Sequence, residues 1–180
     1  MALDCEVEFA RLVLPHRARM QRAIWGVLRD AGLAEDALQD ALVILWRKLR
    51  VLRHHPNPEA FVLRVSIDAA RDQWRARRRR DARARPLEAL RRTPARGDDL
   101  AIDPVEQAET RTAVLAAIDR LGSRQASAIL LRAVEDEAYS DVAQALGCSE
   151  ATARVHVQRA RVKLRQWLGH LRPAPRERST

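Results

Sequence analysis

Apolar residues recur at helical spacing through most of the chain, and no stretch keeps the strict alternation of a strand. The first such pattern covers about residues 6–28, and Pro15 inside it predicts a kink or a break into two short helices. The second covers about residues 34–50, and the third runs from about 59 to 80. The second helix is predicted to bury a leucine stripe formed by Leu38, Leu42, Leu45 and Leu49.

The helical pattern resumes after a change in composition. Residues 83–103 are rich in Arg, Pro, Gly and Asp and poor in large apolar residues, which predicts a flexible basic linker. Four more helices are predicted beyond it, at about 104–121, 123–134, 139–146 and 149–168. The pattern therefore predicts an all-α fold with two small helical domains, at 5–82 and 104–170, and a frayed tail at 171–180.

The last two predicted helices have the pattern of a helix-turn-helix. Gly147 can adopt the left-handed backbone that ends a helix, and Ser149 is a suitable N-cap for the next one. An inward stripe is expected from Ala153, Val157, Ala160, Leu164 and Leu168. The remaining surface of that helix is basic, which indicates a recognition helix for DNA. The alternative is an ordinary amphipathic helix pair whose basic face is only solvated.

Charge and cysteine content narrow the class of partner. The 180 residues carry a net charge of +9, with a pI near 11.1, which favours nucleic acid first and an anionic membrane surface second. No apolar run approaches the ~18 residues of a membrane span, so no membrane insertion is expected. Cys5 and Cys148 are far apart and match no ligand motif, which indicates free thiols and a cytoplasmic protein.

Candidate chemistry points to binding rather than catalysis. His54 and His55 have no third ligand nearby, so neither a metal nor another cofactor is expected. The acidic clusters Asp98-Asp99 and Glu135-Asp136-Glu137 have no nucleophile or base in a plausible pocket, and we interpret both as solvated acids. The chain is therefore not expected to be an enzyme.

Two further segments are candidates for binding. The helix at 34–50 has a polar face that includes Asp36, Gln39, Asp40 and Val43, which either binds a partner or is simply solvated. The helix at 59–80 begins apolar and ends in an arginine run, an arrangement suited to contacts with phosphates.

The N-terminal half resembles region two of the extracytoplasmic-function (group four) sigma factors of bacterial RNA polymerase. Residues 34–40, AEDALQD, with the following LVILWRKL, are similar to that family's AEDLVQE…F…AW segment, ending on Trp46. Residues 61–75, FVLRVSIDAARDQWR, are similar to the family's WLYRIARNLALDRLR and match it at Arg64, Asp72 and Arg75.

The C-terminal half resembles region four of the same family, over residues 121–168. The matching positions are Arg124, Gln125, Leu130, Leu131, Arg132, Tyr139, Ser140, Ala143, Leu146, Gly147, Ser149, Thr152, Arg159, Ala160, Arg161, Leu164 and Arg165. Paired region-two and region-four patterns are much more specific than a helix-turn-helix alone.

The resemblance implies a role for each of three surfaces. The polymerase-binding set, which would contact the clamp helices of the largest subunit, is Asp36, Gln39, Asp40 and Val43. The set implied to read and melt the minus-ten element is Asp68, Arg71, Asp72, Arg75, Arg77 and Arg78. The set implied to enter the minus-thirty-five major groove is Ser149, Glu150, Ala151, Thr152, Arg154, Val155 and Arg159. The implied partners are core polymerase, double-stranded promoter DNA, the melted minus-ten strand and an anti-sigma factor.

The chain departs from the family pattern at several positions. Asp68 stands where the family usually has Asn, and a carboxylate cannot donate to a base acceptor, so Asp68 either weakens minus-ten recognition or reads a cytosine amino group. Residues 135–138, EDEA, replace a common Glu-Gly-hydrophobic turn. The alternative function is a helix-turn-helix regulator that does not act as a polymerase subunit. That function would leave the polar face at 36–43 without a purpose.

Overall fold

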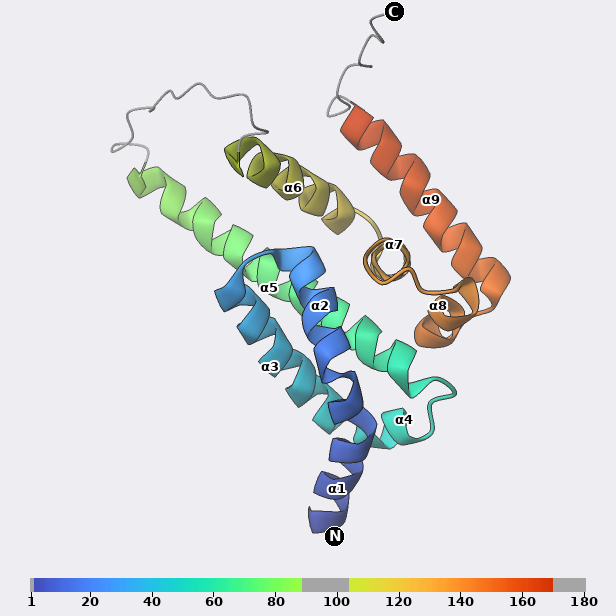
Figure 1. Ribbon diagram of the computed structural model, residues 1–180. Coiled ribbons are helices and arrows are strands. Elements are labelled where there is room, and N and C mark those ends of the chain that lie inside the picture. Colours follow the sequence, from blue (N-terminus) through green and yellow to red (C-terminus); the bar gives the residue numbers. More distant parts are fainter. Residues whose placement is uncertain (1, 89–103, 170–180) are drawn as a thin grey trace, which may run out of the picture.

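The computed structural model describes residues 2–88 and 104–169, which form helices and connecting turns with no strand in either range (Figure 1). The N-terminal unit consists of α1 (Ala2–Val13), η1 (Leu14–His16), α2 (Arg17–Leu28), α3 (Ala31–Arg47), α4 (Leu49–Arg53) and α5 (Pro58–Glu88). The C-terminal unit consists of α6 (Pro104–Asp119), α7 (Ser123–Val134), α8 (Tyr139–Leu146) and α9 (Glu150–Leu168). The predicted all-α architecture with two helical units is confirmed.

The break expected at Pro15 is confirmed, and it takes the form of a short 3-10 turn between α1 and α2. The next boundary agrees with the prediction. Helix α2 ends at Leu28, and Arg29 after it adopts the left-handed backbone, with φ of 50°. Asp30 then caps α3, because its carboxylate accepts a hydrogen bond from the backbone N–H of Leu33 at 2.9 Å. Gly32 therefore lies inside the first turn of α3.

Helix α5 is longer than predicted. It was expected to end near Arg80, but it continues to Glu88, so residues 83–88 of the predicted linker are helical. The remaining linker residues, 89–103, and the predicted tail from 171 lie outside the described part of the chain.

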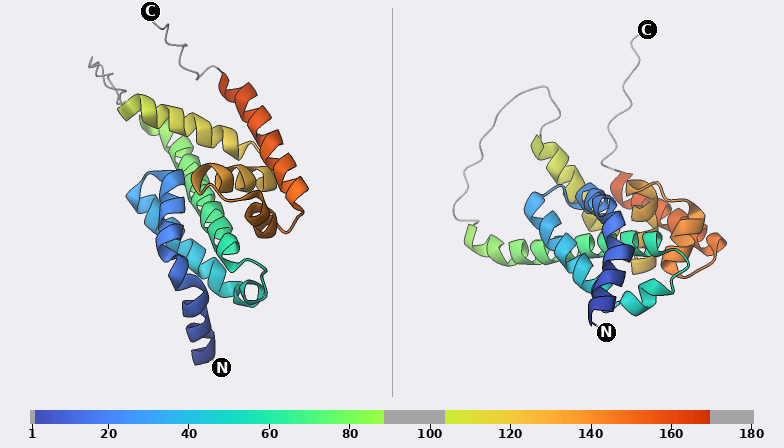
Figure 2. Two further views of the ribbon diagram at one scale, coloured as in Figure 1. Left: turned by 45° about the vertical axis from the view of Figure 1, so that its right-hand side comes forward. Right: turned by 60° about the horizontal axis from the view of Figure 1, so that its bottom comes forward.

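Helix α5 is the axis around which the other helices pack. Helices α2 and α3 lie on one side of it, and α7 and α8 lie on the other, as the views in Figures 1 and 2 agree. In the N-terminal unit the contact between α5 and its neighbours is made by large, fully buried side chains, which are Met20, Ile24, Leu45, Leu63 and Ile67. The same helix thus completes the N-terminal core and contacts the C-terminal unit.

The C-terminal unit has its own set of buried side chains. Leu131 of α7, Val142 of α8 and Val157 of α9 are fully buried where these three helices meet. The unit also approaches α2 closely at one point. A Cβ atom at Gly26 would lie 2.5 Å from Cγ1 of Val134, so a larger residue there requires the Val134 side chain or the helix that carries it to shift.

Candidate nucleic-acid interface and its neighbours

The turn between α8 and α9 has the geometry of a helix-turn-helix. Gly147 ends α8 in the left-handed conformation, with φ of 61°. Ser149 caps α9, because its hydroxyl accepts a hydrogen bond from the backbone N–H of Thr152 at 3.2 Å. Both local predictions made at this turn are confirmed, and the turn fixes where the first residues of α9 face.

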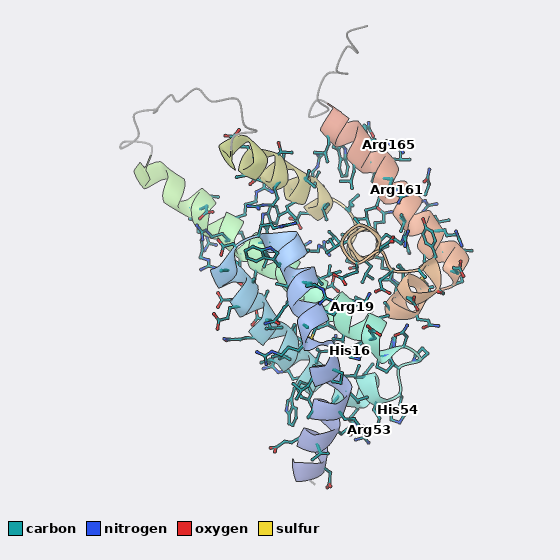
Figure 3. The ribbon with its side chains drawn as sticks, viewed as in Figure 1. His16, Arg19, Arg53, His54, Arg161 and Arg165 are labelled. Carbon is teal, nitrogen blue, oxygen red and sulfur yellow. The ribbon has the colours of Figure 1, made fainter. Side chains whose placement is uncertain are left out.

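The inner and outer faces of α9 divide as predicted. Ala153, Val157 and Ala160 are buried against α7 and α8. The candidate minus-thirty-five residues are exposed except for the half-buried Thr152, and they are Ser149, Glu150, Ala151, Thr152, Arg154, Val155 and Arg159. The basic surface continues toward the C-terminal end of the helix, where Figure 3 labels Arg161 and Arg165. One exposed helical face therefore carries the whole predicted set.

Arg154 is held in place by two neighbours. Its guanidinium carbon lies 4.3 Å from the centroid of the Tyr139 ring, and its Nη2 donates to Glu150 at 2.5 Å. The Tyr139 ring has a second cation near it, because the guanidinium carbon of Arg132 lies 5.0 Å from the same centroid. This contact could not be predicted from the sequence, in which Tyr139 is only a match to the family pattern.

His156 is a second feature of α9 that the sequence did not reveal. Both of its ring nitrogens are buried, and neither has a hydrogen-bond partner within the described residues. Burial lowers the pKa of this imidazole, and the nearby cations Arg124 and Arg159 lower it further. The ring is therefore held in its neutral form beside two arginines.

The candidate polymerase-binding residues form one exposed face of α3. Asp36, Gln39, Asp40 and Val43 are all exposed, while Ala37, Ala41 and Leu45 face the core. Asp40 accepts a hydrogen bond from Gln73 Nε2 of α5 at 2.6 Å. This is the face that the sequence predicted.

The apolar part of this face is larger than expected. Val43 is 48% exposed, and Trp46, which the sequence placed beside the buried leucine stripe, is 44% exposed. The Trp46 ring makes an edge-on contact with Phe9 of α1, with ring centroids 5.2 Å apart. Half-exposed aromatic residues are typical of protein interfaces.

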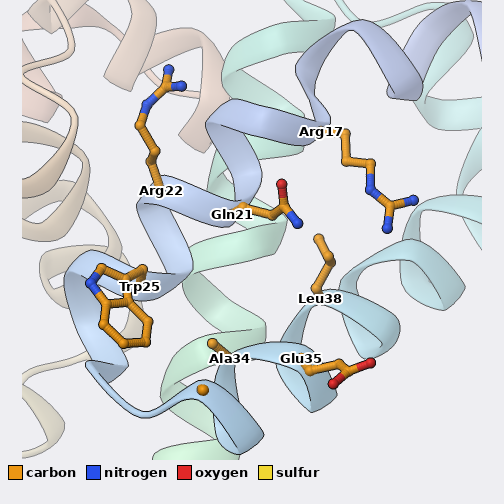
Figure 4. A pocket seen from close by; sticks show the side chains of 8 residues that line it. Arg17, Gln21, Arg22, Trp25, Ala34, Glu35 and Leu38 are labelled. Carbon is orange, nitrogen blue, oxygen red and sulfur yellow. The ribbon is translucent and has the colours of Figure 1, made fainter.

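A hollow of ≈ 500 Å³ adjoins this face between α2 and α3 (Figure 4). Trp25 of α2 and Leu38 of α3 form part of its lining, and Arg17 and Glu35 lie at its edge. Glu35 precedes Asp36 in the chain but belongs to this hollow. Glu35 lies one helical turn before Gln39, so it stands at the edge of the α3 face where that face meets the hollow.

The structure splits the candidate minus-ten residues into two groups. Asp72, Arg77 and Arg78 are exposed, in keeping with contact to a nucleic acid. Asp68 and Arg75 instead contact the C-terminal unit. Asp68 accepts a hydrogen bond from the hydroxyl of Ser127 at 2.7 Å, and Arg75 forms an ion pair with Asp119. In this conformation the predicted minus-ten residues therefore do not form one exposed surface.

Arg71 is the most enclosed of the predicted DNA-binding residues. It is 5% exposed, and its Nη2 atom is buried without a hydrogen-bond partner within the described residues. Burial lowers the pKa of this guanidinium, and the neighbouring Arg75 lowers it further. Its nearest carboxylate oxygen in an ion pair, Asp68 Oδ1, lies 3.6 Å from Nη1.

A cluster around Arg19 of α2 joins the two units. Arg19 donates to Glu59 of α5 at 2.5 Å, to Glu135 at 3.1 Å and to Glu137 (Figure 3). The Glu135–Glu137 segment was predicted to be solvated. That interpretation is wrong for Glu135 and Glu137, and Glu137 is 7% exposed. Burial raises the pKa of Glu137, although the charge of Arg19 opposes the shift.

Two further hydrogen bonds cross between the units. Asn57 Nδ2 donates to Asp141 of α8 at 2.9 Å, and Arg64 Nη1 donates to the carbonyl oxygen of Ala145 at 2.7 Å. Both donors come from the start of α5 or the turn before it. The C-terminal unit is therefore bound along α5 from residue 57 to residue 75.

Neither a metal site nor a membrane span was found in the described ranges. No group of three or more His, Cys, Asp or Glu residues there is arranged to hold a metal ion. His54 and His55 are each engaged with a nearby backbone carbonyl through Nδ1. Among the helices described, none combines the length and the apolar character needed to cross a bilayer.

Comparison with known proteins matches both halves of the chain to one family. The family model described as Sigma-70 region 2 matches residues 12–80, and the model described as Sigma-70, region 4 matches residues 111–164. The chain is 29% identical over 168 residues to the RNA polymerase sigma-E factor of Streptomyces antibioticus, covering 93% of this chain and 88% of that protein. It is 29% identical over 165 residues to the ECF RNA polymerase sigma factor SigM of Mycobacterium tuberculosis, covering 91% and 78% respectively.

A solved structure supports the fold. The chain is similar to CnrH, in a structure of CnrH in complex with the cytosolic domain of CnrY, with a TM-score of 0.51 and 21% sequence identity. The similarity covers 90% of this chain and 88% of that one. At this identity the likeness concerns the arrangement of helices.

Proposed function

This chain belongs to the sigma-70 family of RNA polymerase sigma factors and is of the extracytoplasmic-function type. From that premise we propose that three of its surfaces each carry out one step of promoter-directed initiation. The face of α3 binds core polymerase, α5 contacts the minus-ten element, and α9 reads the minus-thirty-five element. One observation carries this proposal. Both family regions occur in one chain, and each presents an exposed face at the positions that the resemblance implies.

The α3 face suits a protein partner. Asp36, Gln39 and Asp40 offer carboxylate and amide groups, and Val43 with Trp46 adds exposed apolar area beside them. Mixed polar and aromatic surfaces of this kind are typical of protein–protein interfaces. We assign this face to the clamp helices of the polymerase's largest subunit.

The α9 face suits the major groove of DNA. Arg154 and Arg159 are exposed on it, and an arginine can donate two hydrogen bonds to one guanine. Val155 is exposed between them and can contact a thymine methyl group. The cations farther along the helix are placed to contact phosphates, which set the register of the helix on the duplex.

The exposed part of α5 supplies the minus-ten contact. Arg77 and Arg78 can reach phosphates in the conformation described, while Asp68, Arg71 and Arg75 first have to leave their contacts with the C-terminal unit. The function proposed is that of a binding subunit that acts with core polymerase. We also propose an anti-sigma factor as a partner, in keeping with the resemblance.

Co-elution with purified bacterial core polymerase on gel filtration tests the proposal, followed by run-off transcription on a genomic fragment library. The wild-type chain is expected to co-elute stoichiometrically and to produce discrete start sites. Asp40→Arg should abolish co-elution, because it reverses the charge of an exposed carboxylate on the α3 face. Glu35→Arg makes the same charge change on the same helix at the edge of that face, beside the hollow, and it should weaken co-elution less.

Contrary outcomes have distinct meanings. Failure of the wild-type chain to co-elute would contradict the proposed function. Equal loss of co-elution in Asp40→Arg and Glu35→Arg would contradict the assignment of the α3 face. Co-elution without transcripts would leave polymerase binding intact and contradict the assigned minus-ten contact on α5.

A further inference from the structure

The side of α5 that meets the C-terminal unit carries some of the residues proposed to bind minus-ten DNA. Asp68 is bonded to Ser127, and Arg75 is paired with Asp119. Arg71 lies between them in the chain and is buried. A DNA strand and the C-terminal unit cannot occupy these three side chains at the same time.

The contact between the units is built from many polar groups. Arg19 joins α2 to Glu135 and Glu137, Asn57 bonds to Asp141, and Arg64 donates to the carbonyl of Ala145. These donors come from α2, from the turn before α5 and from α5 itself. The partners lie at the end of α7, in the turn after it, and in α8. The described arrangement is thus held at several points and does not rest on one ion pair.

The burial of Arg71 in this conformation has a free-energy cost. Arg71 is 5% exposed, and its buried Nη2 atom has no hydrogen-bond partner among the described residues, so it carries a desolvation cost that its ion pair with Asp68 offsets only in part. A phosphate group could accept a hydrogen bond from that atom when α5 is uncovered.

We propose that the face of α5 formed by Arg64, Asp68, Arg71 and Arg75 is an interaction surface for α6–α8 of the same chain, and that this self-contact competes with minus-ten DNA. In the free protein the C-terminal unit covers the face. Binding to core polymerase then has to shift the population toward an open form before α5 can engage DNA. The competition with DNA rests on the proposed function, whereas the self-contact does not.

Asp68 acquires a role in this arrangement that the family comparison does not suggest. A carboxylate at this position is unsuited to phosphates, but it accepts the Ser127 hydroxyl and lies near Arg64 and Arg71. The departure from Asn therefore serves the contact within the chain. It does not need to be explained by a changed base preference.

The proposal can be tested with the two native cysteines as reporters. Cys5 lies on α1 and Cys148 lies in the turn before α9, and both thiols are free. Spin labels on these residues of the full-length chain report the separation of the two units by electron–electron distance measurement. At low salt we expect one short distance. Raising NaCl to about 1 M should add a longer population, because ion pairs on partly exposed side chains are screened.

A larger residue at position 26 should push the two units apart without altering either proposed binding surface. Gly26→Ala places a methyl group 2.5 Å from Cγ1 of Val134 and should open the contact, while alanine is the better helix former within α2. Gly32→Ala is the matched control, because the nearest atom to its new methyl group is 3.6 Å away. We expect the longer distance to appear at low salt in Gly26→Ala and to be absent in Gly32→Ala.

A charge exchange gives an independent test. Arg19→Glu should open the contact by placing a fourth carboxylate beside Glu59, Glu135 and Glu137. Adding Glu135→Arg should restore the short distance at least in part. Opening by the single change without any restoration by the pair would contradict the assigned cluster.

DNA binding then tests the competition. If about one tenth of the free wild-type chain is open, an opened variant should bind single-stranded DNA of the minus-ten element up to about 10-fold more tightly, since apparent affinity scales with the competent fraction. Gly26→Ala should show this gain and Gly32→Ala should not. Unchanged distances in Gly26→Ala and Arg19→Glu would overturn the self-contact. Opening without tighter DNA binding would overturn the competition alone, and polymerase co-elution tests the proposed function separately.

Discussion

At the scale of single residues, Gly147 and Asp136 share the left-handed backbone, which Arg29 also adopts, but they differ in residue type. Gly147 has φ of 61° and Asp136 has φ of 52°. Glycine adopts this conformation without steric cost, whereas a residue with a Cβ pays about 1 kcal/mol or more. Gly147→Ala is therefore expected to lower the free energy of unfolding by about 1 kcal/mol, as measured by urea denaturation.

The opposite change is expected at Asp136. Asp136→Gly should leave stability unchanged or raise it by up to about 1 kcal/mol, because the strained backbone is relieved and the ion pair lost with Arg132 involves a highly exposed carboxylate. Gly122→Ala serves as the control, since Gly122 has φ of −59° and open space around it. A loss at Asp136 equal to that at Gly147 would contradict the backbone argument.

His156 should make the chain sensitive to acid. Its pKa lies below the ordinary 6.5 in the folded state, so the unfolded state binds a proton first as the pH falls. The stability present above pH 6.5 should then decline as the pH falls from 6.5 through the lowered pKa. His156→Gln is expected to flatten this part of the curve of unfolding free energy against pH. His54→Gln, at an exposed position, should leave it as steep as in the wild type.

Tyr139 is expected to act on DNA binding through Arg154. Tyr139→Leu removes the ring beside the guanidinium and should weaken binding to a promoter fragment by about 0.5–1 kcal/mol, whereas Tyr139→Phe should not. In an Arg154→Ala background, Tyr139→Leu should have no further effect. Additive losses in the double variant, by electrophoretic mobility shift, would show that the ring acts on something other than Arg154.

At the scale of elements, a local cap sets the start of the helix that carries the α3 face. Asp30→Ala removes the acceptor for the Leu33 N–H and should cost about 1 kcal/mol, while Asp30→Ser keeps a hydroxyl acceptor and should cost less. Thermal unfolding followed by circular dichroism measures both. Equal losses in the two variants would mean that the carboxylate contributes by its charge and not as a cap.

Elements of this chain could be predicted wherever the determining interactions are local. Pro15, Gly147 and Ser149 act on their immediate neighbours, and the predicted break, turn and cap are all confirmed. The end of α5 differs from the prediction because residues 83–88 contain Pro86 and only one large apolar residue, Leu87, a composition that indicated a linker. Their Ala, Arg, Leu and Glu residues are nevertheless good helix formers, and the helix continues through them.

At the scale of the whole molecule, the contact between the units could not be predicted from the sequence. Arg19 and Glu137 are 118 residues apart, and neither carries a local pattern that identifies the other. The same limit explains why the exposure of one polar face of α3 could be predicted, whereas the contacts of Asp68 and Arg75 with the C-terminal unit could not. The first depends on the periodicity of one helix, and the second depends on a unit that is distant in the chain.

The close approach at Gly26 makes the strength of the contact between the two units depend on the size of one side chain. Residue 26 is in neither the polymerase-binding nor the DNA-binding set, yet the size of its side chain decides how near Val134 can come. A series from glycine through alanine and serine to valine should therefore raise basal transcription stepwise, without altering which promoters are used. A cell could then retune the threshold of a whole regulon by one substitution at a position remote from every recognition surface.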